Sequence, residues 1–496
     1  MYTHENKILE AKQVFDGLKD YIFQAVSQGE AIHTVEMSVW VSVLEMGRLF
    51  LQGFVAEHGD GDKGETLTFP GGRTVKRLEE LHERRYVSIF GEFPIVRRVY
   101  GTRETQKIEA VPLDASLQLP ESDFSYVLQD WDQNFCVQNS FEESASSVQR
   151  ILGIGQSVRT LEHMNQSMAG YVEGFRESQS VPVEREEGAL LVVAVDGKGV
   201  PMRRKKGDAK PENPRHPKKG EKRNKKRMAC VGAVYTIERF ERTAEDVIDE
   251  ALRKKAQEKR PRPKHKRVRA DLSRAVDGQQ CNGKDILFGW LAEEVQRRNR
   301  KGDKPVICLA DGERALHEAT RRTFDEIIEI LDLYHALERL WDAAHCFYGE
   351  GSDEAEQFVE ERLGKVLEGK VGYVIGGLRQ MATKRGLRGI KKKKIRDITG
   401  YFQNNRSRMR YDEYLEAGFP IGTGVVEGAC RNLVKDRMER AGMRWIVEGA
   451  QAMLDLRATY LNGEWDAFCN YRIEEETKRL YENIVPFEPI KLRLAG

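Results

Sequence analysis

The chain has 496 residues, enough for two to four domains, and its formal net charge is only +2 although 32% of its residues are charged. The seven cysteines include no CxxC pair and no zinc-finger spacing, which argues against a disulfide framework and favours a reducing compartment. The first residues do not form a signal peptide, and the longest apolar run, ALLVVAV, is too short to cross a bilayer. We therefore expect a soluble cytoplasmic protein with no membrane partner.

The front of the chain predicts two amphipathic helices followed by a β-hairpin. Residues 5–57 carry apolar side chains such as Ile8, Phe15 and Ile22 at helical spacing. Residues 84–102, RRYVSIFGEFPIVRRVYGT, contain two β-rich runs on either side of a Gly-Glu turn.

The next segment predicts a helix-turn-helix. Ser140 and Glu143 form a capping box for a helix that ends near Leu152, and Ser157 caps a second helix after a glycine-containing turn. A generic helical hairpin has the same pattern. If the pair is a DNA-binding motif, the second helix presents three candidate groove readers: Arg159, His163 and Gln166.

From about residue 186 the chain has an α/β texture, and two of its predicted buried strands end in an acid. The runs ALLVVAVD and KPVICLAD end in Asp196 and Asp311, and each acid is followed by glycine. A carboxylate beside a core is costly unless it is paired or binds a cation. A single such Asp is more often a cap for the next turn. Two in the same setting indicate a functional site at the strand ends.

A third acid stands in a basic helix behind a Gly-Thr-Gly turn. Glu427, Arg431, Lys435 and Met438 follow helical spacing, so one face would carry a carboxylate and then two cations. A surface ion pair is the simpler interpretation. A metal ligand beside groups that hold a polyanion is the alternative.

Three carboxylates without a His or Cys cluster describe a hard, oxygen-ligated site that suits Mg²⁺ or Mn²⁺. Two such ions can clamp the attacking and leaving oxygens of a phosphoryl transfer. The sequence contains no Walker, HExxH or GxSxG motif.

Basic residues gather in runs that suit a nucleic-acid substrate. Residues 203–227 contain 13 Lys or Arg against three acids, and residues 253–269 contain ten against one. A third run, KKKK, occupies residues 391–394. Each run alone is more often a solvated loop, but three of them around one predicted fold favour a polyanion contact.

The ordered set VDGKGVPM, LADGE, DLYH and GTGVVEGACRNLVKDRMERAGMRW resembles the DDE transposases of bacterial insertion sequences, of the ISKra type, over residues 181–460. The resemblance implies a ribonuclease-H-like catalytic domain and two Mg²⁺ (or Mn²⁺) ions held by Asp196, Asp311 and Glu427. It also implies that His335, in the element that begins at Asp332, lies near the active site. Relatives often carry a zinc ribbon after the hairpin, but this segment has no cysteine here, so we expect no structural zinc.

The fold class expected is therefore α/β, with a helical insertion in the catalytic domain. The expected regions are N-terminal helices and hairpin (1–115), a helix-turn-helix domain (116–180), the catalytic domain (186–334 and 420–460), a helical insertion (335–419) and a C-terminal tail (461–496).

The expected function is DNA cleavage at the ends of the insertion sequence and joining of those ends to target DNA, in the bacterial nucleoid. Pairing two ends implies a homodimer or larger assembly, by mechanism. Besides the groove readers, the expected DNA contacts are Arg203, Arg204, Lys205, Lys206, Arg431, Lys435 and Arg437. A nuclease without strand transfer and a DNA-binding regulator with an inactive catalytic fold remain alternatives.

Overall fold

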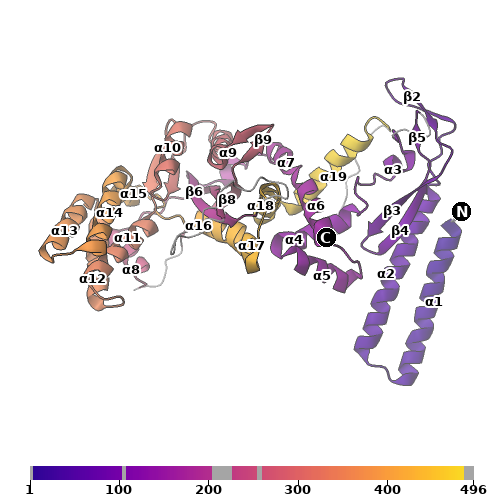
Figure 1. Ribbon diagram of the computed structural model, residues 1–496, viewed down its shortest axis with the longest axis horizontal. Helices are drawn as coiled ribbons and strands as arrows, with labels where there is room; N and C mark the ends of the chain where they lie inside the picture. Colours follow the sequence, from indigo (N-terminus) through magenta and orange to yellow (C-terminus); the bar gives the residue numbers. More distant parts are fainter. Residues whose placement is uncertain (1–3, 103–107, 204–225, 254–259, 485–496) are drawn as a thin grey trace, which may run out of the picture. The chain divides into compact units, whose positions relative to one another are not determined.

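The computed structural model describes residues 4–102, 108–203, 226–253 and 260–484 (Figure 1). The fold is mixed α/β, as predicted. The chain divides into two compact units, the first formed by residues 1–177 and 464–496 and the second by residues 178–463.

Unit 1 begins with the two predicted helices, α1 (His4–Gln28) and α2 (Ile32–Glu57), which form an antiparallel hairpin (Figure 1). Small residues let the helices approach closely. Ala11 and Ala25 of α1 are buried, and a Cβ added at Gly53 of α2 would stand 3.3 Å from Ile8.

The helix α2 also bears on the expectation that no segment could cross a membrane. Among the described residues, it is the one helix that is long and apolar enough to do so by length and composition alone. The interpretation of ALLVVAV as the longest apolar stretch overlooked it, because Glu45 and Arg48 interrupt its apolar run. Core helices of soluble proteins pass the same test, but only 11% of this stretch of α2 is buried.

The predicted β-hairpin is present as β3 (His82–Ser88) and β4 (Gly91–Arg97). Its turn is formed by Ile89 and Phe90 rather than by Gly-Glu, because Gly91 already pairs with Ser88. A second small antiparallel sheet contains β1 (Thr66–Thr68), β2 (Thr74–Arg77) and β5 (Tyr100–Gly101).

The helices of unit 1 confirm the capping analysis. The capping box of Ser140 and Glu143 starts α5, Gly153 ends it with a φ of 71°, and Ser157 caps α6. The unit contains α3 (Pro112–Ser116), α4 (Tyr126–Gln138), α5 (Phe141–Leu152), α6 (Val158–Ala169), α7 (Val172–Ser178) and α19 (Trp465–Tyr481).

The helix α19 lies in the segment for which we expected a tail. Its Arg472 donates to the Gln129 side chain of α4 at 2.6 Å and to Glu476 at 3.0 Å, and all three side chains are buried. Trp465 donates to Asp130 at 2.6 Å. These contacts hold α19 against α4, although the two helices are far apart in sequence.

Unit 2 is built on a five-stranded mixed sheet in the order β12-β11-β6-β7-β8. The strand β7 pairs antiparallel with β6 on one side and with β8 on the other, whereas β11 and β12 run parallel to β6. The strands are β6 (Leu190–Pro201), β7 (Lys226–Ile237), β8 (Lys264–Asp271), β11 (Val306–Ala310) and β12 (Ile328–Leu331).

The sheet core explains why the apolar runs became strands. Residues 190–195 of β6 are fully buried, since this strand is central and both of its faces are covered. Leu287 and Leu291 of α9 (Gly283–Arg298) and Leu316 of α10 (Arg314–Thr323) join the cluster on one face. The strands and helices predicted for this region are present, but β6 continues past Asp196 to Pro201, so the prediction that this strand ends at the acid is wrong. A small hairpin, β9 (Arg274–Val276) and β10 (Gln279–Cys281), precedes α9.

The segment between β12 and Glu427 is helical, as predicted. It contains α11 (Leu333–Phe347), α12 (Asp353–Leu367), α13 (Val371–Lys384), α14 (Gly389–Asn405) and α15 (Tyr411–Glu416). The remaining helices are α8 (Ala244–Ala251), α16 (Gly424–Ala429), α17 (Asp436–Met438) and α18 (Val447–Leu461), with a π-helical segment at Cys430–Lys435.

Side chains from helices cover both outer edges of the sheet. The Tyr411 and Tyr414 hydroxyls donate to the carbonyls of Leu331 and Glu329 of β12, at 2.9 and 3.3 Å. On the other edge, Gln451 of α18 donates to the Ala270 carbonyl at 3.0 Å and accepts from the backbone N–H of Leu272 at 2.9 Å. Asn462 similarly bonds both backbone groups of Val268.

Candidate active site

Three aspartates form a row across the sheet of unit 2. Val195 of β6 pairs with Ala310 of β11, which pairs with Leu331 of β12. The next residue along each strand is Asp196, Asp311 and Asp332, respectively. Because the three strands are parallel and in register, with about 4.8 Å between neighbouring strands, the acids lie at the same level and form one row across the sheet. We call this row, together with Glu427, the acidic edge.

Asp196 is partly buried and accepts two hydrogen bonds from nearby groups. The backbone N–H of Gly197 donates to its Oδ1 at 2.6 Å, and the thiol of Cys430 donates to its Oδ2 at 3.3 Å. Burial raises the pKa of Cys430 most, and the charge of Asp196 raises it further, so this cysteine remains a protonated donor.

Asp311 follows β11 and is held by the turn behind it, since the backbone N–H of Glu313 donates to its Oδ1 at 2.8 Å. Burial raises the pKa of Asp311, and the charge of Asp196 adds to the rise. A Cβ at the intervening Gly312 would overlap the ring of Tyr401, whose Cζ would stand 2.6 Å away. Tyr401 therefore packs directly against the Asp311 turn and requires glycine there.

Asp332 is fully buried and serves as the N-cap of α11. It accepts from the backbone N–H of Tyr334 at 3.0 Å and from the hydroxyl of Thr423. Burial raises its pKa. His335 places its Nε2 3.9 Å from the Asp332 Oδ2 and its Nδ1 3.3 Å from Glu338. The predicted pair of Asp332 and His335 thus lies beside Asp311.

Glu427 approaches the same group from α16. Thr423 lies one turn earlier; its hydroxyl donates to Asp332 and stands 3.4 Å from the Glu427 Oε1. Burial raises the pKa of Glu427, followed in effect by the charge of Asp332, while His335 lowers it. The four carboxylates therefore share one electrostatic environment, although Glu427 is far from the others in sequence.

The donor chemistry of this group fits a divalent cation. In the part of the chain that the structure describes, no Lys or Arg forms an ion pair with Asp196, Asp311 or Glu427, and burial and like charges raise two of their pKa values. Oxygen ligands and excess negative charge are what Mg²⁺ requires. The side chains do not converge fully: among the described residues, no three potential ligands are positioned around one ion.

The basic face predicted after Glu427 is only partly correct. Arg431 and Lys435 are exposed, as a DNA contact requires, but Met438 is fully buried. The π-helical segment adds a residue to the turn and rotates the helical residues after it. Arg437 is also fully buried, with its guanidinium 5.0 Å from the Trp445 ring centre. The prediction that Arg437 contacts DNA is therefore wrong for this structure.

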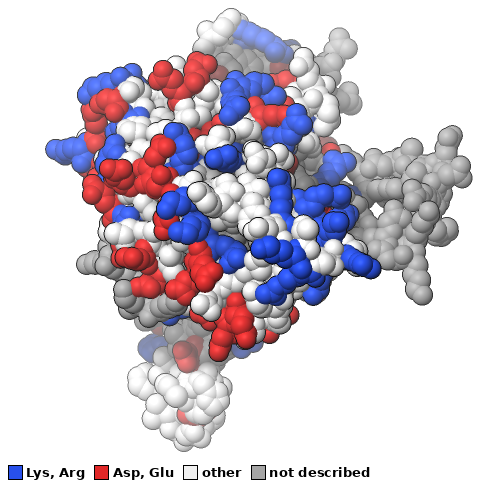
Figure 2. Space-filling model, turned by 90° about the vertical axis from the view of Figure 1, so that its left-hand side faces the viewer, with Lys and Arg blue, Asp and Glu red and all other residues white. Residues whose placement is uncertain are grey.

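The other predicted DNA contacts fall in different places. Arg159, His163 and Gln166 are all exposed on one face of α6. Arg203 is exposed, and its backbone N–H donates to the Trp445 carbonyl at 2.8 Å. Arg204, Lys205 and Lys206 lie outside the described residues, as does most of the first basic run. Figure 2 shows a face on which Lys and Arg side chains gather on one side.

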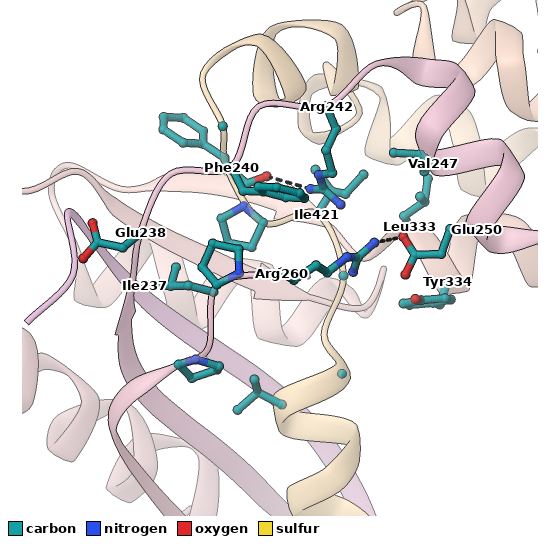
Figure 3. A pocket seen from close by; sticks show the side chains of 18 of the residues that line it. Ile237, Glu238, Phe240, Arg242, Val247, Glu250, Arg260, Leu333, Tyr334 and Ile421 are labelled. Atoms are coloured by element: carbon teal, nitrogen blue, oxygen red, sulfur yellow. Dashed lines mark hydrogen bonds and ion pairs between the residues drawn. The ribbon is translucent and has the colours of Figure 1, made fainter. Parts of the chain in front are cut away.

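A cavity of about 250 Å³ opens where α11 begins (Figure 3). Phe240 and Tyr334 supply aromatic walls, Arg242 donates to the Phe419 carbonyl at 3.2 Å, and Arg260 pairs with Glu250. Burial lowers the pKa of Arg242 to about 10. None of the four carboxylates lines this cavity, so it is distinct from the acidic edge.

Sequence reasoning overlooked Thr423, Tyr401 and Cys430. Thr423 stands in the Gly-Thr-Gly turn one helical turn before Glu427, which is a usable signal. Tyr401 and Cys430 have no such signal, because their roles depend on packing between distant segments.

No protein-family model matches the chain, and no curated protein matches its sequence.

Proposed function

We propose that the chain is a DNA transposase whose catalytic centre is the acidic edge of unit 2. The observation that carries this proposal is the strand register, which sets Asp196 beside Asp311 on adjacent parallel strands. Two carboxylates on neighbouring strands, without a Lys or Arg ion pair among the described residues, are costly to folding unless they serve a ligand.

The sheet supports a ribonuclease-H-like domain in this proposal. The first strand, β6, is central, its two successors form an antiparallel half, and the last two strands form a parallel half. The first acid of the expected triad lies within β6, the second follows β11, and the third arrives on a helix after the helical insertion. We also propose that α4, α5 and α6 form a helix-turn-helix module. These helices pack together, and Arg159, His163 and Gln166 of α6 share an exposed face.

In this proposal, Asp196, Asp311 and Glu427 would hold two Mg²⁺ (or Mn²⁺) ions. When bound, such ions stabilise the charge on the attacking and leaving oxygens of phosphoryl transfer. His335 is half-buried beside Asp332, where its ring can donate to a phosphate oxygen. Arg431 and Lys435 are exposed on the segment after Glu427, where they would bind the phosphate backbone of double-stranded DNA. The protein would act in the bacterial cytoplasm, on the nucleoid, with at least two copies in the DNA complex.

The test is DNA cleavage and joining by the purified full chain. The substrate is the DNA that flanks its own gene, incubated with Mg²⁺ or with EDTA. We expect metal-dependent nicks at defined ends, followed by joined products. Asp311→Asn should reduce the rate by at least about 10³-fold, which corresponds to about 4 kcal/mol of barrier.

A matched control is Asp285→Asn, which alters an exposed acid of α9 that pairs with Arg322. This variant should retain activity. Nicks without joined products would assign a nuclease instead. Binding of DNA without cleavage, equal for both variants and independent of metal, would overturn the enzyme assignment and favour a regulator.

A further inference from the structure

The helices α1 and α2 expose an unusual amount of apolar surface. Six large apolar side chains on α1 and seven on α2 are exposed, more than half of the 25 found among the described residues. Single exposed apolar side chains are normal, but a concentration of this kind indicates a binding surface.

Part of this surface has the spacing of helix–helix packing. Ile8, Phe15 and Ile22 follow one another at intervals of seven residues on α1. On α2, Val43 and Phe50 are also seven apart, and Phe54 lies one turn later. A seven-residue apolar repeat is the pattern by which helices pack side by side in coiled coils and bundles. We call these six side chains the apolar stripe.

The other faces of α2 already have partners within unit 1. Leu49 is buried, and Gly53 approaches Ile8 of α1. Leu44 packs against a cluster that includes Val87, and Leu51 packs against the cluster of Phe93 and Ile95. The stripe residues of α2 are left exposed: the exposed fractions of Phe50 and Phe54 are 51% and 56%.

We propose that the apolar stripe binds the same stripe of a second copy of this chain, so that two α1–α2 hairpins form a four-helix bundle. A seven-residue repeat packs against helices with the same repeat, and a second copy offers an identical surface related by a two-fold axis. Burying the exposed parts of the six side chains in both copies removes roughly 1,000 Å² of surface, about the minimum for a specific interface.

The charges on α1 favour a helical partner over a bilayer. Asp16 and Lys19 flank the stripe, pair at 3.2 Å and remain about half exposed. Such pairs are compatible with the rim of a bundle but costly inside hydrocarbon. The inference does not rest on the transposase assignment, although a dimer is what the pairing of two DNA ends would need.

The test is the mass of the full chain in solution, by light scattering after size exclusion or by sedimentation equilibrium. We expect a dimer for the native chain and a monomer for the double variant Phe15→Glu/Phe50→Glu. Both sites are exposed within one copy, so the circular dichroism spectrum of the double variant should not change. The matched control is Phe23→Glu, at a position of α1 that is 70% exposed but outside the stripe, and it should remain dimeric.

Charge complementation identifies the partner. Mixing Phe15→Glu/Phe50→Glu with Phe15→Lys/Phe50→Lys should restore a dimer that neither variant forms alone. A native chain that is monomeric at all concentrations, or a dimer that survives the double variant, would overturn the proposal. Flotation with phosphatidylcholine vesicles that the double variant abolishes would assign the stripe to a membrane instead.

Discussion

Two aspartates stand at strand ends in the two halves of the same sheet, and the charged groups around them differ. Asp271 ends β8 and is fully buried, with Arg269 at 2.7 Å and Arg274 at 2.8 Å. Asp311 follows β11, where its charged neighbours are Asp196, Glu313 and the partly exposed His335.

The difference separates a structural acid from a candidate functional one. The chain supplies Asp271 with its own cations, so this ion pair is complete without a ligand. Asp311 lies in a group of carboxylates whose mutual repulsion the described residues do not offset with Lys or Arg. Carboxylates that repel one another in this way have raised pKa values and favour a cation as ligand.

The largest expected effect on stability comes from removing the charge of Asp271, whose ion pairs are complete within the chain. Asp271→Asn should lower the free energy of unfolding by about 3 kcal/mol, because it removes the charge of a fully buried acid that pairs with two arginines. Urea unfolding of the full chain at neutral pH measures this loss. Asp311→Asn is the comparison and should show no loss. An equal loss in both variants would mean that Asp311 is also a structural acid.

An intermediate effect is expected from Mg²⁺. At a concentration ten times the dissociation constant, the ion should stabilise the native chain by about 1.4 kcal/mol. Thermal unfolding with and without Mg²⁺ gives the shift. Asp196→Asn should abolish it, whereas Asp285→Asn, on the surface of the same unit, should not. A shift that persists in Asp196→Asn would place the ion elsewhere.

The smallest expected effect is a dependence of the stability of the native chain on pH when no metal ion is present. Folding raises the pKa of Asp311, so the folded state binds its proton more tightly and the native chain loses stability as pH rises through this range. In EDTA at pH 7, Asp311→Asn should therefore be more stable than the native chain. The advantage should shrink on acidification and vanish below about pH 4, the ordinary range of an Asp. Unfolding curves across this pH range check the sign, and a variant less stable than the native chain at pH 7 would contradict it.

Much of the fold could be predicted because local patterns determine it. The uninterrupted apolar run before Asp196 requires a central strand, and the capping box at Ser140 fixes where α5 begins. The position of Asp311 at a strand end could also be predicted, since it follows directly from where the apolar run stops, whereas β6 continues past Asp196 to Pro201 as an antiparallel partner of β7.

The parts that sequence could not supply depend on contacts between distant segments. The contact of Tyr401 with the Asp311 turn joins the helical insertion to the sheet, and no spacing rule anticipates it. The burial of Arg437 follows from a π-helical turn, whereas the prediction assumed a regular helix. The apolar stripe could not be predicted for a similar reason. Helical spacing identifies the apolar faces of a helix, but it does not show which of these faces are buried within the chain.

The covered edges of the sheet have a consequence for how copies of this protein meet. An open strand offers a row of backbone groups to any passing strand, which is the usual route to uncontrolled fibre growth. Here Tyr411 and Tyr414 occupy acceptors on the β12 edge, and Gln451 and Asn462 occupy backbone groups of β8 and the residue after it. Unit 2 is thereby discouraged from polymerising through the edges of its sheet.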